Sequence, residues 1–280
     1  MQTLSTIASL RQTVADWRNT GQTLAFVPTM GNLHDGHIEL VRQAKRQADR
    51  TIVSIFVNPT QFGPTEDFNH YPRSETEDTA KLSAVGADML FLPTASEIYP
   101  TPPQTRISLP ELSNRLCGIS RPGHFDGVAL VVAKLLNMVQ PDILLLGEKD
   151  FQQLSILRQM VLDLNMPVTI ASVATQRHSD GLAMSSRNSY LTAEQRQTAP
   201  LLYQTLCAVR DAILANDTDF TRLSAAASAT LTQAGFKVDY LHTCRQHDLQ
   251  PATTADTNIV ILAAAWLGST RLIDNVCFSG

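Results

Sequence analysis

The chain has 280 residues, of which 44% are hydrophobic and 17% are charged, and its formal net charge is −4. This length allows one large domain or two ordinary ones with a full apolar core. The modest negative charge and the lack of a basic run argue against nucleic acid as the main partner, but they leave room for an anionic metabolite in a locally positive pocket.

Neither a membrane segment nor a metal motif is expected. The longest apolar run, residues 259–267, is far shorter than the about 20 residues that span a bilayer, and residues 1–17 lack the apolar core of a signal peptide. The four cysteines are widely separated and form no C-x-x-C pattern, which favours thiols in a reducing compartment and argues against zinc. We therefore expect a cytoplasmic protein without a membrane partner.

Residues 4–19 have apolar side chains at helical spacing and predict a helix that packs without taking part in chemistry. Residues 26–41 then predict a strand, a tight turn and a second helix. Gly31 and Gly36 allow positive φ or a close approach to a ligand, and the free N–H groups at the helix start favour phosphate. His34 and His37 stand at the same helix end, where imidazoles can contact phosphate oxygens. The alternative is an ordinary βα turn with two surface histidines.

Four further apolar runs, residues 51–57, 88–92, 141–146 and 168–173, predict buried parallel strands. Ligands of open α/β sheets bind at the carboxyl ends of such strands. Gln61 follows the first of these runs and Lys149 follows the third, where a lysine can reach phosphate. For both side chains the alternative is an exposed surface residue.

Several segments between these strands predict local structure only. The acids Glu75, Glu77 and Asp78 are interpreted as helix-start residues, which the helix dipole favours. Residues 128–139 predict a helix with Asp126 as its N-cap. Arg121 and His124 precede this helix, and either they face a site or they anchor a loop.

Residues 184–188, Met-Ser-Ser-Arg-Asn, combine two hydroxyls, a cation and an amide. Such a set can bind an anion, although alone it is no more than a polar loop. Helical patterns over residues 193–215 and 220–234 precede short strands at 237–241, 258–262 and 270–273, which predicts a small α+β domain. We place the domains at residues 1–176 and 177–280, so that residues 184–188 lie at a domain interface, where ligands commonly bind.

In combination, these segments resemble the pantoate–β-alanine ligase (pantothenate synthetase) family. The family belongs to the nucleotide-binding superfamily that includes the class I aminoacyl-tRNA synthetases. The resemblance spans essentially the whole chain and rests on residues 28–37, 56–63, 121–125, 147–153 and 180–188. It implies an α/β fold, with a Rossmann-like parallel sheet that binds ATP and pantoate and a smaller C-terminal α+β lid domain.

The resemblance also implies an AMP-forming ligase of the coenzyme A pathway. Such an enzyme condenses (R)-pantoate with β-alanine through a pantoyl-adenylate and releases AMP and pyrophosphate. It would use ATP together with Mg²⁺, whose protein ligands stay unknown, and would be a homodimer. No residue stands out as the general base for the β-alanine amine.

The resemblance implies roles for individual residues. Those implied to be catalytic are His37, as the acid of adenylation, His34, Lys149 and Arg187. Those implied to bind ATP are Pro28, Thr29, Met30, Gly31, Asn32, Leu33, His34, Asp35, Gly36, His37, Gly147, Glu148, Lys149, Asp150, Gln176, Met184, Ser185, Ser186 and Arg187. Those implied to bind pantoate or β-alanine are Gln61, Gln153, Met30 and Asn58.

Neutral glutamines suit a carboxylate that must attack phosphorus, because an amide orients the oxygens and leaves lone pairs available. Two positions depart from the family pattern, since His178 stands where an acid is common and Gln176 where an aliphatic residue is common. If position 176 meets adenine through its main chain, its side chain can vary. The C-terminal domain matches the family less well.

Two other functions fit parts of the pattern. A nucleotidyltransferase that leaves the adenylyl group on its product shares the histidine motif, and product analysis would separate it from a ligase that makes free AMP and an amide. A non-catalytic nucleotide-binding protein would have lost some of the polar positions, but every expected position is filled.

Overall fold

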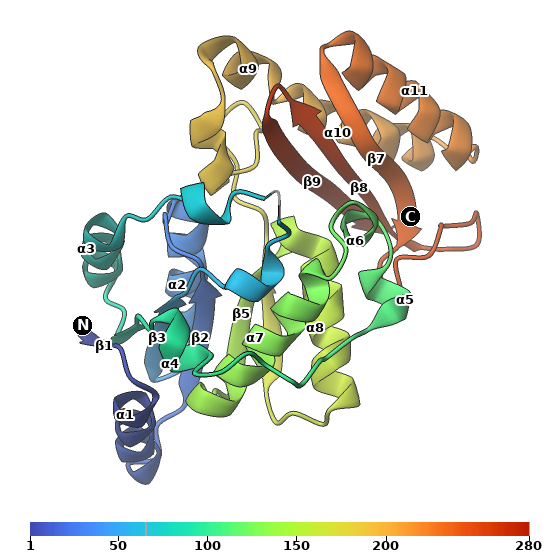
Figure 1. The fold of residues 1–280 in the computed structure, drawn as a ribbon. Coiled ribbons are helices and arrows are strands. Elements are labelled where there is room, and N and C mark those ends of the chain that lie inside the picture. Colours follow the sequence, from blue (N-terminus) through green and yellow to red (C-terminus); the bar gives the residue numbers. More distant parts are fainter. Residues whose placement is uncertain (65, 280) are drawn as a thin grey trace. The chain divides into compact units, whose positions relative to one another are not determined.

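Figure 1 shows a computed structural model of the chain, which describes residues 1–64 and 66–279. Gly280, the last residue of the predicted second domain, lies outside the described residues. The chain divides into two compact units. The first comprises Met1–Glu148 and Ile156–Ala174, and the second comprises Lys149–Ser155 and Thr175–Gly280.

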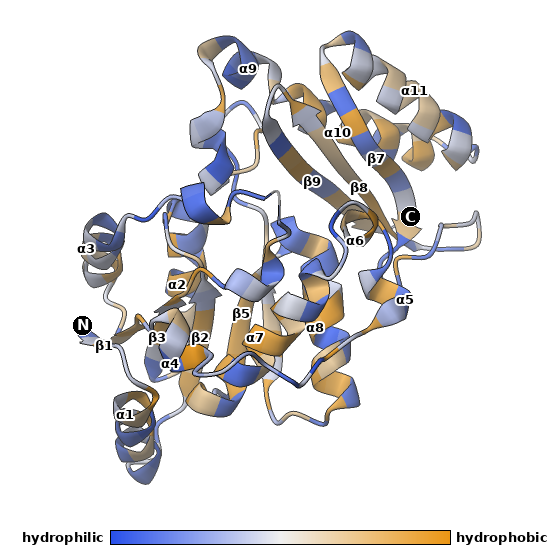
Figure 2. Cartoon of the chain, in the orientation of Figure 1, coloured by the Kyte–Doolittle hydropathy of each residue, from blue (hydrophilic) through white to orange (hydrophobic). Residues whose placement is uncertain are grey.

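The described part of the first unit contains a six-stranded parallel sheet with the strand order β1-β4-β3-β2-β5-β6. The strands are β1 (Gln2–Leu4), β2 (Leu24–Thr29), β3 (Arg50–Ile55), β4 (Met89–Phe91), β5 (Ile143–Gly147) and β6 (Thr169–Val173). The central strands are buried, and Figure 2 shows apolar residues concentrated on strands and on one side of the helices. The covered sheet accounts for the unbroken apolar runs of the sequence.

Helices connect these strands, as parallel pairing requires. They are α1 (Ile7–Asn19), α2 (Asp35–Gln47), α3 (Glu75–Val85), α4 (Ala95–Ile98), α5 (Pro110–Ser113), α6 (Cys117–Ser120), α7 (His124–Val139) and α8 (Phe151–Asp163). Short 3₁₀ turns are η1 (Pro59–Gln61), η2 (Phe68–His70) and η3 (Glu148–Asp150).

The sheet reverses its winding direction between β2 and β5. From β2 the chain continues to β3 and β4 on one side, whereas β5 and β6 lie on the other side of β2. Ligands of doubly wound sheets bind beyond the carboxyl ends of the strands at such a switch point. The turn after β2 carries Gly31, and β5 ends at Gly147, directly before Glu148, so the topology places these predicted site segments at the favoured position.

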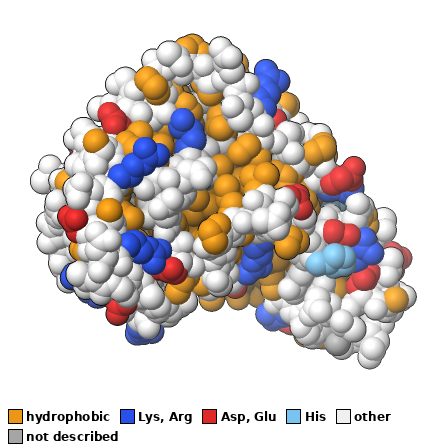
Figure 3. Space-filling model, turned by 90° about the horizontal axis from the view of Figure 1, so that it is seen from below, with side chains coloured by type: hydrophobic (Ala, Val, Ile, Leu, Met, Phe, Trp, Pro, Cys, Tyr) orange, Lys and Arg blue, Asp and Glu red, His pale blue; other side chains and the backbone are white. Residues whose placement is uncertain are grey.

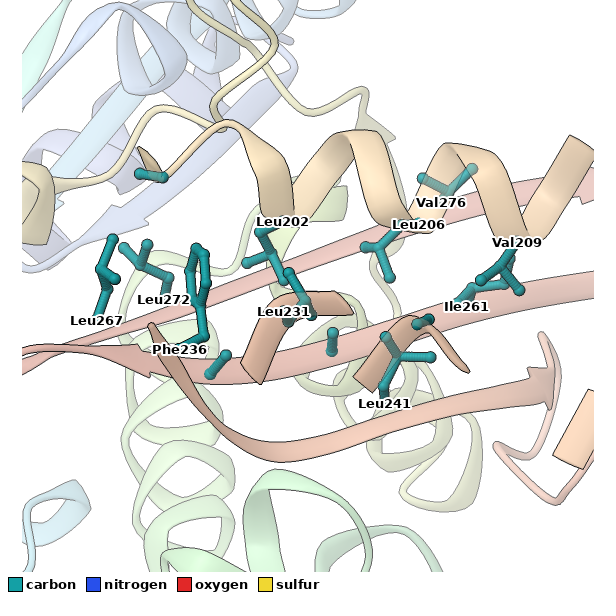
Figure 4. Packing of buried hydrophobic residues seen from close by; sticks show 14 of the residues in the cluster. Leu202, Leu206, Val209, Leu231, Phe236, Leu241, Ile261, Leu267, Leu272 and Val276 are labelled. Carbon is teal, nitrogen blue, oxygen red and sulfur yellow. The ribbon is translucent and has the colours of Figure 1, made fainter. Parts of the chain in front are cut away.

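The second unit is an antiparallel sheet packed with helices. Its elements are η4 (Ser186–Tyr190), α9 (Ala193–Thr198), α10 (Leu201–Leu214), α11 (Phe220–Gln233), β7 (Phe236–Arg245), β8 (Asn258–Leu267) and β9 (Thr270–Ser279). Figure 4 shows Leu202, Leu206 and Val209 of α10 facing side chains of the sheet, with Leu231 of α11 in the same cluster. The predicted fold class, a parallel α/β sheet with a smaller α+β part, is confirmed.

Some predicted elements differ from the observed ones. The helix predicted over residues 4–19 begins only at Ile7, because Thr6 caps it by accepting from the N–H of Ser9, and Gln2–Leu4 instead forms an edge strand paired with β4. Asp126 is not the N-cap of α7. The helix begins at His124, after Gly123 in the left-handed region, so Asp126 lies within its first turn.

In the second unit, the single helix predicted over residues 193–215 is two helices that meet at Ala199 and Pro200. Proline has no N–H to continue the first helix but is well tolerated where the next one starts. The strands predicted in this unit are shorter than the observed β7, β8 and β9. In β8, for example, the strand continues through three fully or almost fully buried alanines, Ala263 to Ala265. Alanine has little intrinsic preference for strands, and here burial decides. Within the described residues, no helix is long and apolar enough to cross a bilayer.

Candidate active site

The turn after β2 is shaped by two consecutive residues with positive φ, Gly31 at 84° and Asn32 at 50°. A Cβ on Gly31 would lie 3.0 Å from the Ile55 side chain and 3.2 Å from the Asp78 carboxylate, so a larger residue would be crowded there as well as strained by the positive φ. The turn forms an anion-binding concavity of backbone N–H groups. The anion inside it is the carboxylate of Asp78, which accepts from the N–H groups of Asn32 and Leu33 at 2.8 Å each.

At the start of α2, too, backbone N–H groups that we expected from the sequence to be free are bound by side chains of the chain itself. The Nδ1 atom of His34 accepts from the Gly36 N–H at 3.2 Å, and the Nδ1 atom of His37 accepts from the His34 N–H at 3.3 Å. The two imidazoles therefore cap the helix reciprocally, as Ser/Thr and Glu do in an ordinary capping box. The backbone donors expected to face phosphate are thus largely used inside the protein.

This capping determines the tautomer of both rings. A nitrogen that accepts a backbone N–H carries no proton, so each neutral ring has its proton on Nε2. The ring centroids lie 4.1 Å apart. The pair therefore presents two Nε2–H donors from one helix end, which makes the imidazoles, rather than the backbone, the donors suited to phosphate oxygens.

The predicted pantoate ligand Gln61 lies in η1 and is 8% exposed. Its Oε1 accepts from Asn58 Nδ2 at 3.1 Å, and its Nε2 donates to the Met30 sulfur at 3.1 Å. A thioether is a weak acceptor, so an oxygen of a ligand can replace it. The Asn58 contact thereby orients the amide so that Gln61 presents its donor group next to Met30.

The Asn58 side chain is itself fixed. It is 1% exposed, its Nδ2 also donates to the Gly127 carbonyl at 3.1 Å, and its Oδ1 accepts from the Tyr99 hydroxyl at 3.0 Å. Burial raises the pKa of Tyr99, so the phenol keeps its proton and remains a donor. Both N–H groups of the Asn58 amide are used inside the protein. The geometry therefore favours an indirect role, in which Asn58 orients the Gln61 side chain.

Arg121 and His124 anchor η1. His124 Nδ1 donates to the Gln61 carbonyl at 2.7 Å, and its Nε2 lies 2.9 Å from Arg121 Nη1. The Arg121 guanidinium also donates from Nε to Glu66 at 2.9 Å. The first turn of α7 approaches closely, because a Cβ on Gly127 would lie 2.2 Å from the Thr60 carbonyl oxygen. Of the two readings that the sequence left open, loop anchoring is the one observed.

In the second unit, the predicted phosphate ligand Lys149 is held through its backbone, because its carbonyl accepts from Asn275 Nδ2 at 3.0 Å. Asn275 lies on β9 and is 5% exposed. The backbone of Lys149 is thus attached to a strand of its own unit, which restricts the region that its ammonium group can reach.

Residues 176–184 of the second unit form a hairpin-like loop. The Met184 N–H donates to the Gln176 carbonyl at 2.9 Å, and Arg177 bridges Ala183. Arg177 holds this loop to β9 through two parallel hydrogen bonds to Asp274, of 2.7 and 2.9 Å, and its guanidinium lies 3.5 Å from the Tyr203 ring centroid. Immediately beyond the loop, the Ser185 hydroxyl accepts from the Arg187 N–H at 3.3 Å and caps η4.

We expect Asp274→Asn to lower the free energy of unfolding by about 3 kcal/mol, because it leaves the half-buried guanidinium of Arg177 without its charge partner. The Asp274 side chain is only 2% exposed. Denaturant titration followed by circular dichroism measures the change. Asp211→Asn, which breaks an ion pair whose acid is 62% exposed, is the matched control and should change stability by less than about 1 kcal/mol. Equal effects of the two variants would contradict the prediction.

The predicted site residues fall into two groups by unit. The first unit holds Pro28, Thr29, Met30, Gly31, Asn32, Leu33, His34, Asp35, Gly36, His37, Asn58, Gln61, Gly147 and Glu148. The second unit holds Lys149, Asp150, Gln153, Gln176, Met184, Ser185, Ser186 and Arg187. Within its own unit, each group contains direct contacts between members, such as His34 with His37 and Gln176 with Met184. The ligand contacts of individual residues stay predictions.

Sequence reasoning missed the supporting residues of both groups. Asp78 was interpreted as a helix-start acid, yet it is fully buried, four residues before the buried Leu82 on the same face of α3. That helical spacing was the available signal. Asp274 was recognisable as an acid within an apolar strand. Among residues 1–64 and 66–279, no group of three or more His, Cys, Asp or Glu side chains is arranged to hold a metal ion.

Comparison with known proteins adds sequence and structural relatives. Residues 2–277 match the family model described as pantoate-beta-alanine ligase. A pantothenate synthetase of Pseudomonas putida (strain W619) is 53% identical over 99% of this chain and 97% of its own length. One of Methylococcus capsulatus (strain ATCC 33009 / NCIMB 11132 / Bath) is 53% identical over 100% of this chain and 98% of its own length.

Solved structures give the same result. The crystal structure of pantothenate synthetase from Thermus thermophilus has a TM-score of 0.93 at 41% identity and covers 99% of both chains. The pantoate-beta-alanine ligase of Francisella tularensis, complexed with beta-gamma ATP and beta-alanine, has a TM-score of 0.80 at 36% identity, and the match covers 99% of this chain and 97% of that chain.

Proposed function

The chain belongs to the pantoate–β-alanine ligase family and catalyses the ATP-dependent condensation of pantoate with β-alanine, and we propose that it does so through a pantoyl-adenylate. In the first step a carboxylate oxygen of pantoate attacks the α-phosphorus of ATP and pyrophosphate leaves. In the second, the neutral amine of β-alanine attacks the activated carbonyl carbon, AMP leaves with the bonding electron pair, and the amine loses a proton. The products are pantothenate, AMP and pyrophosphate.

The observation that carries this proposal is the reciprocal capping of His34 and His37, which gives each neutral ring an Nε2–H donor at the start of α2. Negative charge moves onto the α-phosphate and the leaving pyrophosphate during adenylation. Preorganised donors aimed at that charge stabilise the transition state more than the ground state. We assign this role to both histidines. We propose that His37 also acts as the proton donor to the leaving group.

Cations complete the charge stabilisation in this proposal. Lys149 supplies a point charge and Arg187 a planar guanidinium, the two geometries that proteins use for phosphate. Their support comes from the Lys149 carbonyl bound to Asn275 and from the Ser185 cap that starts η4. Residues 28–37, 147–150, 176 and 184–187 would surround the nucleotide, with Gln176 offering its main chain to adenine.

Gln61 and Gln153 would hold pantoate, with Met30 beside Gln61. Because Asn58 occupies the Oε1 of Gln61, the Nε2 donor is the part of that amide available to a pantoate oxygen. A neutral donor orients the carboxylate without pairing its charge, which keeps the attacking oxygen nucleophilic. Asn58 contributes to pantoate binding by fixing this orientation.

We further propose that Mg²⁺ enters with ATP and leaves with pyrophosphate. Mg²⁺ usually takes its ligands from substrate phosphates and water, together with one or two carboxylates. Bound in this way it neutralises the charge of the leaving group. Removal of Mg²⁺ with a chelator should therefore abolish adenylation.

The second part of the proposal concerns the oligomeric state and the cellular compartment. Exposed apolar side chains at Ile119, Leu162 and Leu164, and the apolar side chains gathered on one face in Figure 3, support a homodimer. The four cysteines are thiols rather than disulfides, as in proteins of a reducing compartment, which supports the cytoplasm. Light scattering on the purified protein tests the dimer.

Exchange between ATP and labelled pyrophosphate tests the adenylate. We expect exchange that requires pantoate and does not require β-alanine, because reversal of the first step alone returns the label to ATP. A companion assay for free AMP and the amide separates the ligase from a nucleotidyltransferase. Folded protein that forms pantothenate without pantoate-dependent exchange would rule out the adenylate route.

A further inference from the structure

The turn that precedes the histidine pair is held from α3, a helix that none of the predicted site residues belongs to. The carboxylate of Asp78 accepts from the Leu33 N–H with Oδ1, and from the Asn32 N–H and the Ser74 hydroxyl with Oδ2, at 2.8, 2.8 and 3.1 Å. Asp78 is fully buried. A carboxylate offers about four acceptor sites and no donor, so it matches a concavity that contains only donors.

One turn further along α3, Lys81 holds the same residue from its other side. Its Nζ donates to the Leu33 carbonyl at 2.6 Å. Both backbone polar groups of Leu33 are therefore bound by α3, and the Leu33 side chain is 2% exposed in the core of the first unit. Leu33 is fixed at three points immediately before His34, the N-cap of α2.

The orientation of the histidines depends on that fixed point. The capping bond to His37 starts from the N–H of His34, the atom that follows Leu33 in the backbone. A change in the turn at residues 31–33 moves this N–H and weakens the bond that keeps His37 Nδ1 unprotonated. The ring could then carry its proton on either nitrogen, and the Nε2–H donor would lose its direction.

We propose that Asp78 is a positioning residue for adenylation: its buried carboxylate fills the anion-binding turn of Gly31 and Asn32 and thereby fixes the tautomer and direction of His34 and His37. Lys81 assists from the same helix. The consequence for catalysis rests on the function proposed above, whereas the consequence for the imidazoles does not. The turn that the sequence suggested for an anion is thus occupied by the carboxylate of Asp78. The imidazoles, rather than this turn, are then the groups that bind phosphate.

The experiment compares Asp78→Asn with the unaltered protein by two measurements. An amide has the size of a carboxylate but replaces one acceptor with a donor, which opposes one of the two backbone N–H groups. We expect the rate constant of pantoate-dependent exchange to fall by about 10²-fold, because misplaced catalytic groups have effects of this size. The KM for pantoate should change by less than about threefold, since Gln61 is untouched.

The second measurement is the two-bond ¹H–¹⁵N spectrum of the imidazoles, assigned with His34→Gln and His37→Gln. In the unaltered protein, both rings should be in the Nε2–H form, and in Asp78→Asn at least one should populate both forms. This result does not depend on the reaction, so it supports the positioning role even if exchange were absent from the unaltered protein. Helix anchoring alone would leave the tautomers unchanged.

The matched control is Glu75→Gln, which removes an exposed carboxylate from the same first turn of α3. It should leave both measurements unchanged. If Asp78→Asn does not fold, Lys81→Met tests the proposal in its place, since Lys81 is exposed and its loss frees only the Leu33 carbonyl. In Lys81→Met, a mixture of tautomers or a several-fold slower exchange supports the proposal. Folded Asp78→Asn, or folded Lys81→Met in its place, with native tautomers and a native exchange rate would overturn it.

Discussion

Replacement of His37 by alanine is expected to lower the kcat for pantothenate formation by about 10²-fold or more, because a donor to the transition state is lost. His37 also accepts the N–H of His34, so the variant releases the neighbouring ring as well. Single-turnover measurements should locate the defect in formation of the adenylate. Hydrolysis or aminolysis of an adenylate already formed should be affected much less.

His247→Ala is the control for this experiment, since the His247 side chain is 71% exposed and lies in the second unit. It should retain the activity of the unaltered protein. His37→Gln adds information, because its amide can still donate one hydrogen bond, and we expect it to recover part of the lost rate. An unchanged kcat in folded His37→Ala would remove this histidine from the chemistry.

Replacement of Lys149 by methionine should lower kcat/KM for ATP by about 10²-fold or more, because a phosphate-binding charge is removed. Methionine keeps the aliphatic stem, and the backbone carbonyl still accepts from Asn275, so the loop should stay in place. Initial rates of exchange over a range of ATP concentrations separate two effects. Weaker binding of ATP in the ground state raises KM, whereas weaker stabilisation of the transition state lowers kcat.

Lys149→Arg keeps the charge but changes its shape, and we expect an intermediate loss. Lys237→Met, at an exposed position of β7, is the control for the loss of a positive charge. Native rates in both Lys149 variants would show that this lysine does not touch the phosphates.

Much of the fold follows from local patterns. The strand runs at residues 51–57 and 141–146 and the α2 helix were predicted because apolar spacing reports burial directly. The edge strand Gln2–Leu4 was missed because a short edge strand carries no periodic signal, and β8 was predicted too short because its alanines belong to a strand only by virtue of the core around them.

The segments proposed for the candidate site could be recognised in the sequence for the same reason. Motifs such as residues 28–37 and 184–188 keep their chemistry within a few residues, so the chain displays them as segments. The supporting bonds connect distant segments, and Asp78 lies 45 residues from Leu33. In the sequence it stands in a run of acids beside Glu75 and Glu77, from which its buried position on α3 distinguishes it.

The sequence by itself determined that Gly31 begins a turn suited to an anion, that two histidines follow at a helix start, and that Gln61 follows a buried strand of a parallel α/β fold. These properties depend on side-chain type and local spacing. Only the tertiary structure decided which anion fills the turn, which imidazole nitrogen carries the proton, and which end of the Gln61 amide faces Met30. Each of these depends on a partner brought in by sheet order and helix packing, and such partners have no fixed distance along the chain.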